Sequence, residues 1–191
     1  MSILAALPAY ADSDLTLFGA AQHQGKLTLQ SAESTITTTS NFNPGTFGSF
    51  GIRFSHGKIF GGEHTFQYSP NFLSGDSKAI IYHSDFMLQA PLPKIRPYAT
   101  AGLGLIATWG ETSSGLPAIS KGPRFAMNYG GGVKVFPAGP VGVRADIRGF
   151  VVPGATFNIP ISLPTGLAAT VQSQSHTLNL LEVSLGVVFK F

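Results

Sequence analysis

Nine ionisable side chains are placed where they could do chemistry together. Each lies in a segment with the alternating pattern of a strand, so each projects toward one face of it. Such a cluster could conduct ions, or it could consist of ion pairs that neutralise one another. A close pair attracts by about 4 kcal/mol at an effective dielectric of 20 before desolvation, and an unpaired buried charge is strongly unfavourable. We therefore expect a network that plugs an interior, built from Arg53, Glu63, His83, Asp85, Lys134, Arg144, Asp146, Arg148 and Glu182.

Glu63 and His83 allow a more specific hypothesis within this cluster. If the two strands that carry them pair symmetrically about Leu73, their side chains face each other inside and could relay a proton. An ordinary interior ion pair satisfies the same pairing, and we favour that interpretation.

Other chemistry finds little support in the sequence. Ser175, His176 and Asp76 could contribute to a hydrolase site, but adjacent residues on a strand point to opposite faces, which separates Ser175 from His176. No Gly-x-Ser-x-Gly motif is present. The five His residues lack metal-ligand spacing, and Gly130–Gly132 lacks the Lys-Ser/Thr and the helix of a phosphate loop. We expect no enzymatic activity, no cofactor and no metal.

The elements that must position these side chains are strands, and the clearest is the last one. From Leu181 to Phe191 every second residue is large and apolar, with Glu182, Ser184 and Gly186 among those between. Such alternation indicates a strand with one apolar and one polar face. The same pattern predicts eight strands, near residues 15–29, 49–55, 59–69, 79–89, 98–109, 125–135, 141–151 and 178–191.

The connections between these strands alternate in length. Short turns follow the second, fourth and sixth strands, at 56–58, 90–93 and 137–140. Longer connections follow the first, third, fifth and seventh strands, at 31–45, 70–77, 110–123 and 153–175. We therefore predict an all-β fold: an eight-stranded antiparallel transmembrane up-and-down β-barrel with short periplasmic turns and longer extracellular loops.

The placement of charge favours lipid outside this barrel. In mid-strand the charged residues fall on the parity opposite to the large apolar residues, and an Arg or Lys facing lipid at mid-depth costs roughly 2–4 kcal/mol. A soluble lipocalin-like barrel would place the apolar set inside, where its repeated Phe and Tyr are too bulky for eight strands to enclose. His64 and Ser84 are exceptions on the apolar parity, which would suit a gap between protomers or a position near an interface.

Composition excludes several other classes of protein. Charged residues make up 11% of the 191 residues, well below the roughly 25% of soluble domains. No apolar run reaches the roughly 18–20 residues of a membrane-spanning helix, and the absence of Cys excludes disulfides. The net charge of +3 does not indicate a nucleic-acid partner, because most positive charges are expected inside the barrel.

Three segments carry a resemblance to a known group of proteins: Leu185–Phe191, Pro97–Gly104 and Gly142–Arg148. In them the chain resembles the small outer-membrane β-barrels of Gram-negative bacteria, the OmpA-like or opacity-protein-like group. The resemblance implies the barrel fold and a location in the outer membrane, in contact with its lipid. It also implies that the last strand carries the signal read by the barrel-assembly machinery during insertion, on Leu185, Val187, Phe189 and Phe191.

Two further expectations concern the N-terminus and the last connection. Ala9-Tyr10-Ala11 fits a signal-peptidase site, so we expect residues 1–11 to be the remnant of a signal peptide and 12–191 to be the barrel domain; an ordinary apolar arm is the alternative. The last connection is unusually apolar. It would contact an extracellular partner or lipid, or pack on itself as an extension of the flanking strands, through Phe157, Ile159, Ile161, Leu163 and Leu167.

Together these observations predict an outer-membrane barrel with a plugged, charged lumen and a structural role, or a role in adhesion or recognition through its loops. Three alternatives stay open: a narrow pore for small solutes, a lipid-modifying outer-membrane enzyme and a soluble lipocalin-like binding barrel.

Overall fold

The protein was analysed as a computed structural model. The structure describes residues 12–24, 27–33, 36–42, 45–72, 77–110, 118–119, 122–155, 157–162, 168–172 and 176–191. Side chains are described for 12–24, 45–72, 77–110, 122–154 and 177–191. The expectation of a signal-peptide remnant at 1–11 lies outside the described residues.

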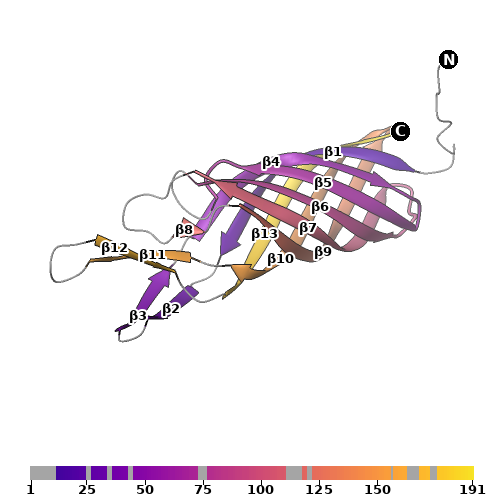
Figure 1. The fold of residues 1–191 in the computed structure, drawn as a ribbon. Helices are drawn as coiled ribbons and strands as arrows, with labels where there is room; N and C mark the ends of the chain where they lie inside the picture. Colours follow the sequence, from indigo (N-terminus) through magenta and orange to yellow (C-terminus); the bar gives the residue numbers. More distant parts are fainter. Residues whose placement is uncertain are drawn as a thin grey trace, which may run out of the picture.

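Eight antiparallel strands form a closed barrel, which confirms the predicted fold class. Each strand pairs with the next barrel strand along the chain, and the first pairs with the last (Figure 1). The barrel strands are β1 (Ser13–Gln24), β4 (Gly45–His56), β5 (Phe60–Ser69), β6 (Lys78–Gln89), β7 (Ile95–Trp109), β9 (Gly122–Ala138), β10 (Val141–Ala155) and β13 (His176–Lys190).

The two ends of the barrel differ in their connections. At one end, here called the short-turn end, the chain passes from β4 to β5, from β6 to β7 and from β9 to β10 within a few residues. The first residues of β1 and the last residues of β13 lie at this end too, where Phe191 N donates to the Ser13 carbonyl at 2.9 Å. The opposite end carries the longer connections and is called the long-connection end.

Three of the predicted loops, 31–45, 110–123 and 153–175, contain strands of their own. The segment 31–45 is largely taken up by a hairpin of β2 (Leu27–Glu33) and β3 (Ile36–Phe42), so the first strand stops at Gln24 instead of continuing to residue 29. The segment 153–175 contains β11 (Phe157–Ser162) and β12 (Ala168–Gln172), which form a three-stranded sheet with β8 (Ala118–Ile119). Both small sheets project from the long-connection end (Figure 1).

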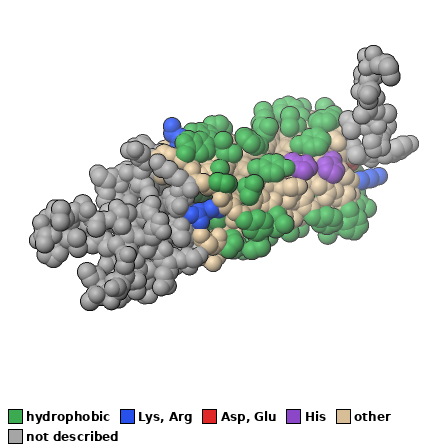
Figure 2. Space-filling view, in the orientation of Figure 1, with side chains coloured by type: hydrophobic (Ala, Val, Ile, Leu, Met, Phe, Trp, Pro, Cys, Tyr) green, Lys and Arg blue, Asp and Glu red, His purple; other side chains and the backbone are tan. Residues whose placement is uncertain are grey.

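The outer surface of the barrel is apolar. Along each strand, buried and exposed positions alternate, and the exposed ones carry most of the large apolar side chains. Phe86, Leu103 and Ile147, from three different strands, are more than half exposed, at 58%, 55% and 55%. Figure 2 shows these apolar side chains as a band around the visible face of the barrel. The described part of the chain contains no helix long and apolar enough to span a bilayer.

Candidate functional site

The inward side chains of the barrel form the candidate site. All nine ionisable residues predicted for the interior are buried there. Eight of them, on β4, β5, β6, β10 and β13, are linked in one ion-pair network, and Lys134 on β9 pairs separately with Asp14 on β1. They gather because every second residue of a strand points inward, and because closing the sheet directs these positions of several strands toward one axis.

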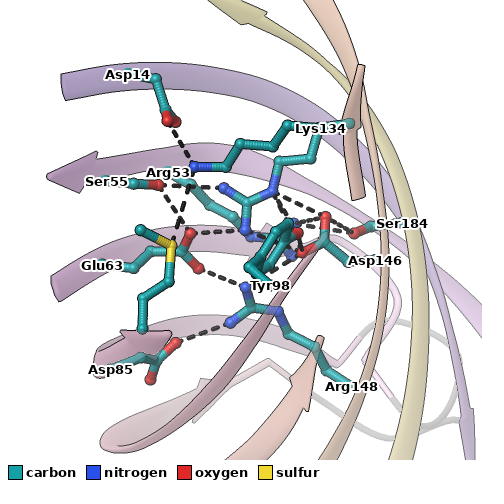
Figure 3. Close-up of polar contacts among 12 residues, drawn as sticks. Asp14, Arg53, Ser55, Glu63, Asp85, Tyr98, Lys134, Asp146, Arg148 and Ser184 are labelled. Atoms are coloured by element: carbon teal, nitrogen blue, oxygen red, sulfur yellow. Dashed lines mark hydrogen bonds and ion pairs between the residues drawn. The ribbon is translucent and has the colours of Figure 1, made fainter. Parts of the chain in front are cut away.

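Glu63 stands at the centre of one half of this network. Its Oε2 lies 2.6 Å from Nη2 of Arg144, and its Oε1 accepts from Nη2 of Arg148. Arg148 also reaches Asp85, with 2.8 Å between Nη1 and Oδ2. Arg148 therefore joins the carboxylate of Glu63 on β5 to that of Asp85 on β6 (Figure 3).

Arg53 organises the other half. Its Nη1 lies 2.8 Å from Oδ2 of Asp146, and its Nη2 lies 2.8 Å from Oε1 of Glu182. The remaining oxygen of Glu182 accepts hydrogen bonds from the amides of Gln22 and Gln67, at 2.8 and 2.7 Å. The charge of Glu182, which is 1% exposed, is thus compensated in the interior, where an unpaired carboxylate would be costly.

Several polar residues that complete the network were not predicted. Tyr98 accepts from Nε of Arg144 at 2.7 Å and donates to Asp146. Lys134 pairs with Asp14, with 2.5 Å between Nζ and Oδ2. Tyr98 fits inside because Gly132 beside it has no side chain: an added Cβ would meet the Tyr98 ring at 2.9 Å. Parity was the available signal, since Asp14 and Tyr98 fall on the inward positions of β1 and β7.

The predicted pairing of Glu63 with His83 is wrong. Glu63 lies opposite Asp85, and His83 lies opposite Thr65, so the hairpin is centred one residue further along the chain than assumed. His83 instead approaches Asp85 on its own strand, with 2.8 Å between Nδ1 and Oδ2. In a hairpin, moving the centre by one residue moves every pairing by two, which keeps His83 inside but removes it from Glu63.

A second, apolar layer fills the long-connection end of the interior. Phe150 packs edge-on against His83, with ring centroids 5.6 Å apart, so this layer begins where the ion-pair network ends. Phe47 and Phe72 meet in a similar edge contact at 5.2 Å. The buried members of this layer are Phe47, Phe72, Ala79, Ile81, Ile106, Ala126, Phe150, Val152, Leu178 and Leu180.

The sequence contains a signal for this layer that parity analysis overlooked. Toward the long-connection end, neighbouring residues are apolar on both parities, as in Ile80-Ile81, Leu105-Ile106 and Leu180-Leu181. A strand with apolar residues on both faces is one that is covered on both faces.

The remaining predicted site residues lie on or directly after β13, on β11 or outside the described residues. Leu185, Val187 and Phe189 point outward on β13, and Phe191 follows the strand with 70% of its surface exposed. Phe157, Ile159 and Ile161 belong to β11, whose side chains are outside the description. Leu163, Leu167, Ser175 and Asp76 lie outside the described residues, and His176 begins β13.

Comparison with known structures identifies this architecture. In sequence, the chain matches no protein-family model and no curated protein. In structure, it is similar to the outer membrane protein OprG of Pseudomonas aeruginosa, with a TM-score of 0.63, 12% identity and coverage of 95% of this chain and 96% of that one. This chain has the fold of the small outer-membrane β-barrels.

Two further structures share this outer-membrane barrel fold. Neisserial surface protein A matches with a TM-score of 0.55 and 15% identity, covering 95% of this chain and 99% of that one. The N-terminal β-barrel domain of Pseudomonas aeruginosa OprF matches with a TM-score of 0.56 and 12% identity, covering 93% of this chain and 97% of that one. The resemblance inferred from the terminal and glycine-rich strands is therefore confirmed at the level of the fold.

At the short-turn end of the barrel, Asp12 ties together strands that are far apart in the sequence. Its Oδ2 lies 3.0 Å from Nη1 of Arg96 on β7, and its Oδ1 lies 2.9 Å from Nζ of Lys190 on β13. Partial burial by itself would raise the pKa of Asp12, but the hydrogen bond from Lys190 and the charge of Arg96 hold this pKa below its ordinary value of 3.8. The carboxylate therefore stays ionised at neutral pH.

Proposed function

We propose that the protein is an outer-membrane barrel of a Gram-negative bacterium whose lumen is closed, and that it acts structurally or through the segments at its long-connection end. The apolar outer band supports the location, since in a bilayer such a band faces lipid, whereas in water it would drive aggregation. In this orientation the short-turn end faces the periplasm and the long-connection end faces outside.

The observation that carries the closed lumen is its two successive layers. A solute would first have to pass the apolar layer that includes Phe72, Phe150 and Leu178, each about 1% exposed. It would then meet the ion-pair network, in which Arg53 and Arg144 are fully buried. The apolar layer opposes the passage of polar and charged solutes, and the ion-pair network opposes apolar ones. The two layers in series therefore oppose both kinds.

A role in adhesion or recognition rests on the small sheets beyond the barrel. We infer that the segment 153–175, which contains β11 and β12, provides the contact surface, through Phe157, Ile159 and Ile161 and through Leu163 and Leu167, which lie outside the described residues. Apolar residues held beyond a membrane by a paired sheet suit contact with an extracellular partner or with lipid. Pairing within this sheet also accommodates the alternative in which these residues pack on one another.

We also propose that β13 is the strand that the barrel-assembly machinery reads during insertion. Leu185, Val187 and Phe189 are exposed on one face of the strand, so a receptor could bind them in an extended segment before the barrel closes. This partner would act during assembly, whereas the surrounding partner of the finished barrel would be the lipid of the outer membrane.

Conductance across a planar bilayer tests the closed lumen. After reconstitution of the wild-type protein, we expect a current no different from that of the protein-free bilayer, because both interior layers block the path. Gel mobility of unboiled protein recovered from the same preparation verifies that folded barrel was present, and a general porin provides the positive control. Discrete current steps from the folded wild-type barrel would contradict the closed lumen and support the narrow pore.

A further inference from the structure

A row of polar side chains interrupts the apolar outer face of the barrel. His56 on β4, His64 on β5 and Tyr82 on β6 lie next to one another, with centroids 6.3 Å apart for the two imidazoles and 6.4 Å apart for His64 and Tyr82. Ser84 lies directly opposite His64 in the pairing of β5 with β6. Figure 2 shows the two histidines side by side among apolar side chains.

Part of this row stands at mid-depth in the apolar band. The outward residues of β5 run from Phe60 near the short turn to Tyr68 near the other end, and His64 lies halfway between them. In the proposed membrane orientation, His64 and Ser84 therefore face the hydrocarbon. Polar groups in hydrocarbon are unfavourable unless they find hydrogen-bond partners, and an ionisable residue there indicates a functional contact.

The barrel itself satisfies this row only in part. Nδ1 of His64 lies 3.2 Å from the Tyr82 hydroxyl, which leaves Nε2 of His64 available. Within the described residues, the Ser84 hydroxyl has no side-chain or backbone hydrogen-bond partner, although the side chain lies on the exposed face. Both tautomers of His64 present an unused group at Nε2, a donor in one and an acceptor in the other.

The unused groups complement each other. A serine hydroxyl both donates and accepts, so Ser84 can bond to Nε2 of His64 in either tautomer. The two groups cannot bond to a lipid chain, which has no polar atoms at this depth. One patch therefore carries both halves of a hydrogen-bonded pair, which is the property that a two-fold symmetric interface requires.

We propose that this face binds a second copy of the chain, with a two-fold axis parallel to the barrel axis, so that His64 of each subunit bonds to Ser84 of the partner subunit. Such an axis keeps the same ends of both barrels on the same side of the membrane. Around the paired polar groups, the exposed side chains of Phe66, Phe86 and Leu103 supply apolar contact. The proposal rests on the membrane location proposed above.

Cross-linking in vesicles tests this interface directly. The chain has no Cys, so Leu103→Cys introduces a single thiol opposite Ser84 in the pairing of β6 with β7 and leaves His64 and Ser84 intact. Ile147→Cys is the matched control, because Ile147 has the same exposed fraction of 55% and lies on β10, across the barrel from β5. A short bis-maleimide is added to each variant at low protein-to-lipid ratio.

We expect several-fold more cross-linked dimer from Leu103→Cys than from Ile147→Cys. Adding His64→Leu to Leu103→Cys should reduce the yield to that of the control, whereas adding His64→Gln, which retains a hydrogen-bonding side chain, should preserve much of it. Equal yields from the two single-thiol variants would overturn the proposal, and so would a yield that His64→Leu leaves unchanged. These variants are compared only after the unboiled gel band shows each one folded in the vesicles, so failure of the membrane location is seen separately as failure to insert.

Discussion

Replacement of Arg144 by methionine should lower the free energy of unfolding by about 3–5 kcal/mol, the cost of removing one partner from a buried ion pair. Arg144 is fully buried. Its Nη2 lies 2.6 Å from Oε2 of Glu63 and 3.0 Å from Oδ1 of Asp146. Methionine fills much of the same space but provides no charge or donor. The carboxylate of Glu63 would then depend on Arg148 and Ser55 alone.

Urea unfolding of the barrel in phospholipid vesicles measures this loss. Lys190→Met serves as the control, because the Lys190 pair with Asp12 is about a third exposed and such pairs contribute at most about 1 kcal/mol. Combining Arg144→Met with Glu63→Gln should recover part of the lost stability, since it removes the charge left without its partner. If Arg144→Met cost no more than Lys190→Met, the network would not hold the interior together.

Replacement of Ile147 by arginine should destabilise the barrel in vesicles by roughly 2–4 kcal/mol, because it places a charge in hydrocarbon near mid-depth. Ile147 points outward from the middle of β10, where it lies opposite Val183 on one side and Gly131 on the other. On a water-facing surface the same substitution would change stability by no more than about 0.5 kcal/mol. The measured change in the free energy of unfolding therefore distinguishes an outer face in contact with lipid from one in contact with water.

Leu92→Arg is the matched control for this experiment. Leu92 has a similar exposed fraction, 50%, but lies in the turn between β6 and β7, at the short-turn end. Near the membrane interface an added arginine costs only about 0–1 kcal/mol. Equal and small effects at both positions would contradict a lipid-facing outer surface, whereas a large effect at Ile147 alone supports it.

Much of the barrel could be predicted from the sequence because, in the proposed membrane location, hydrocarbon penalises charge on one face of every strand. That penalty separates Arg53, Lys134 and Arg148 from the large apolar residues by parity, and parity in turn identifies the strands and the inward positions. The short turns were predictable for a related reason, since Pro and Gly at 137–140 interrupt the strand pattern.

The extensions beyond the barrel could not be predicted in the same way. The sequence of the β2–β3 hairpin has Ser and Thr at both odd and even positions, so it lacks the one-sided apolar pattern that identified the barrel strands. Its β-branched threonines at 37–39 nevertheless favour extended backbone. The β11 strand falls within the segment 153–175, which was predicted as a long connection. It contains Pro160, and a proline is compatible with a strand position at which no N–H is needed.

Details of the interior depended on register, which parity alone leaves undetermined. Parity placed both Glu63 and His83 inside, but the centre of the β5–β6 hairpin decided that Glu63 lies opposite Asp85. Similarly, the role of Tyr98 depends on the space left at Gly132, which lies directly opposite it on β9 although the two residues are 34 positions apart in the sequence. Contacts between distant strands therefore had to come from the structure.

The most direct test of a membrane-embedded barrel is the gel mobility of the wild-type protein after refolding in detergent micelles or vesicles, with and without boiling. We expect the unboiled protein to migrate as a compact species that slows on boiling, with a strand-rich circular dichroism spectrum before heating. A protein that instead stays monomeric and folded in buffer without detergent or lipid would contradict the account, because its apolar band could not then face water.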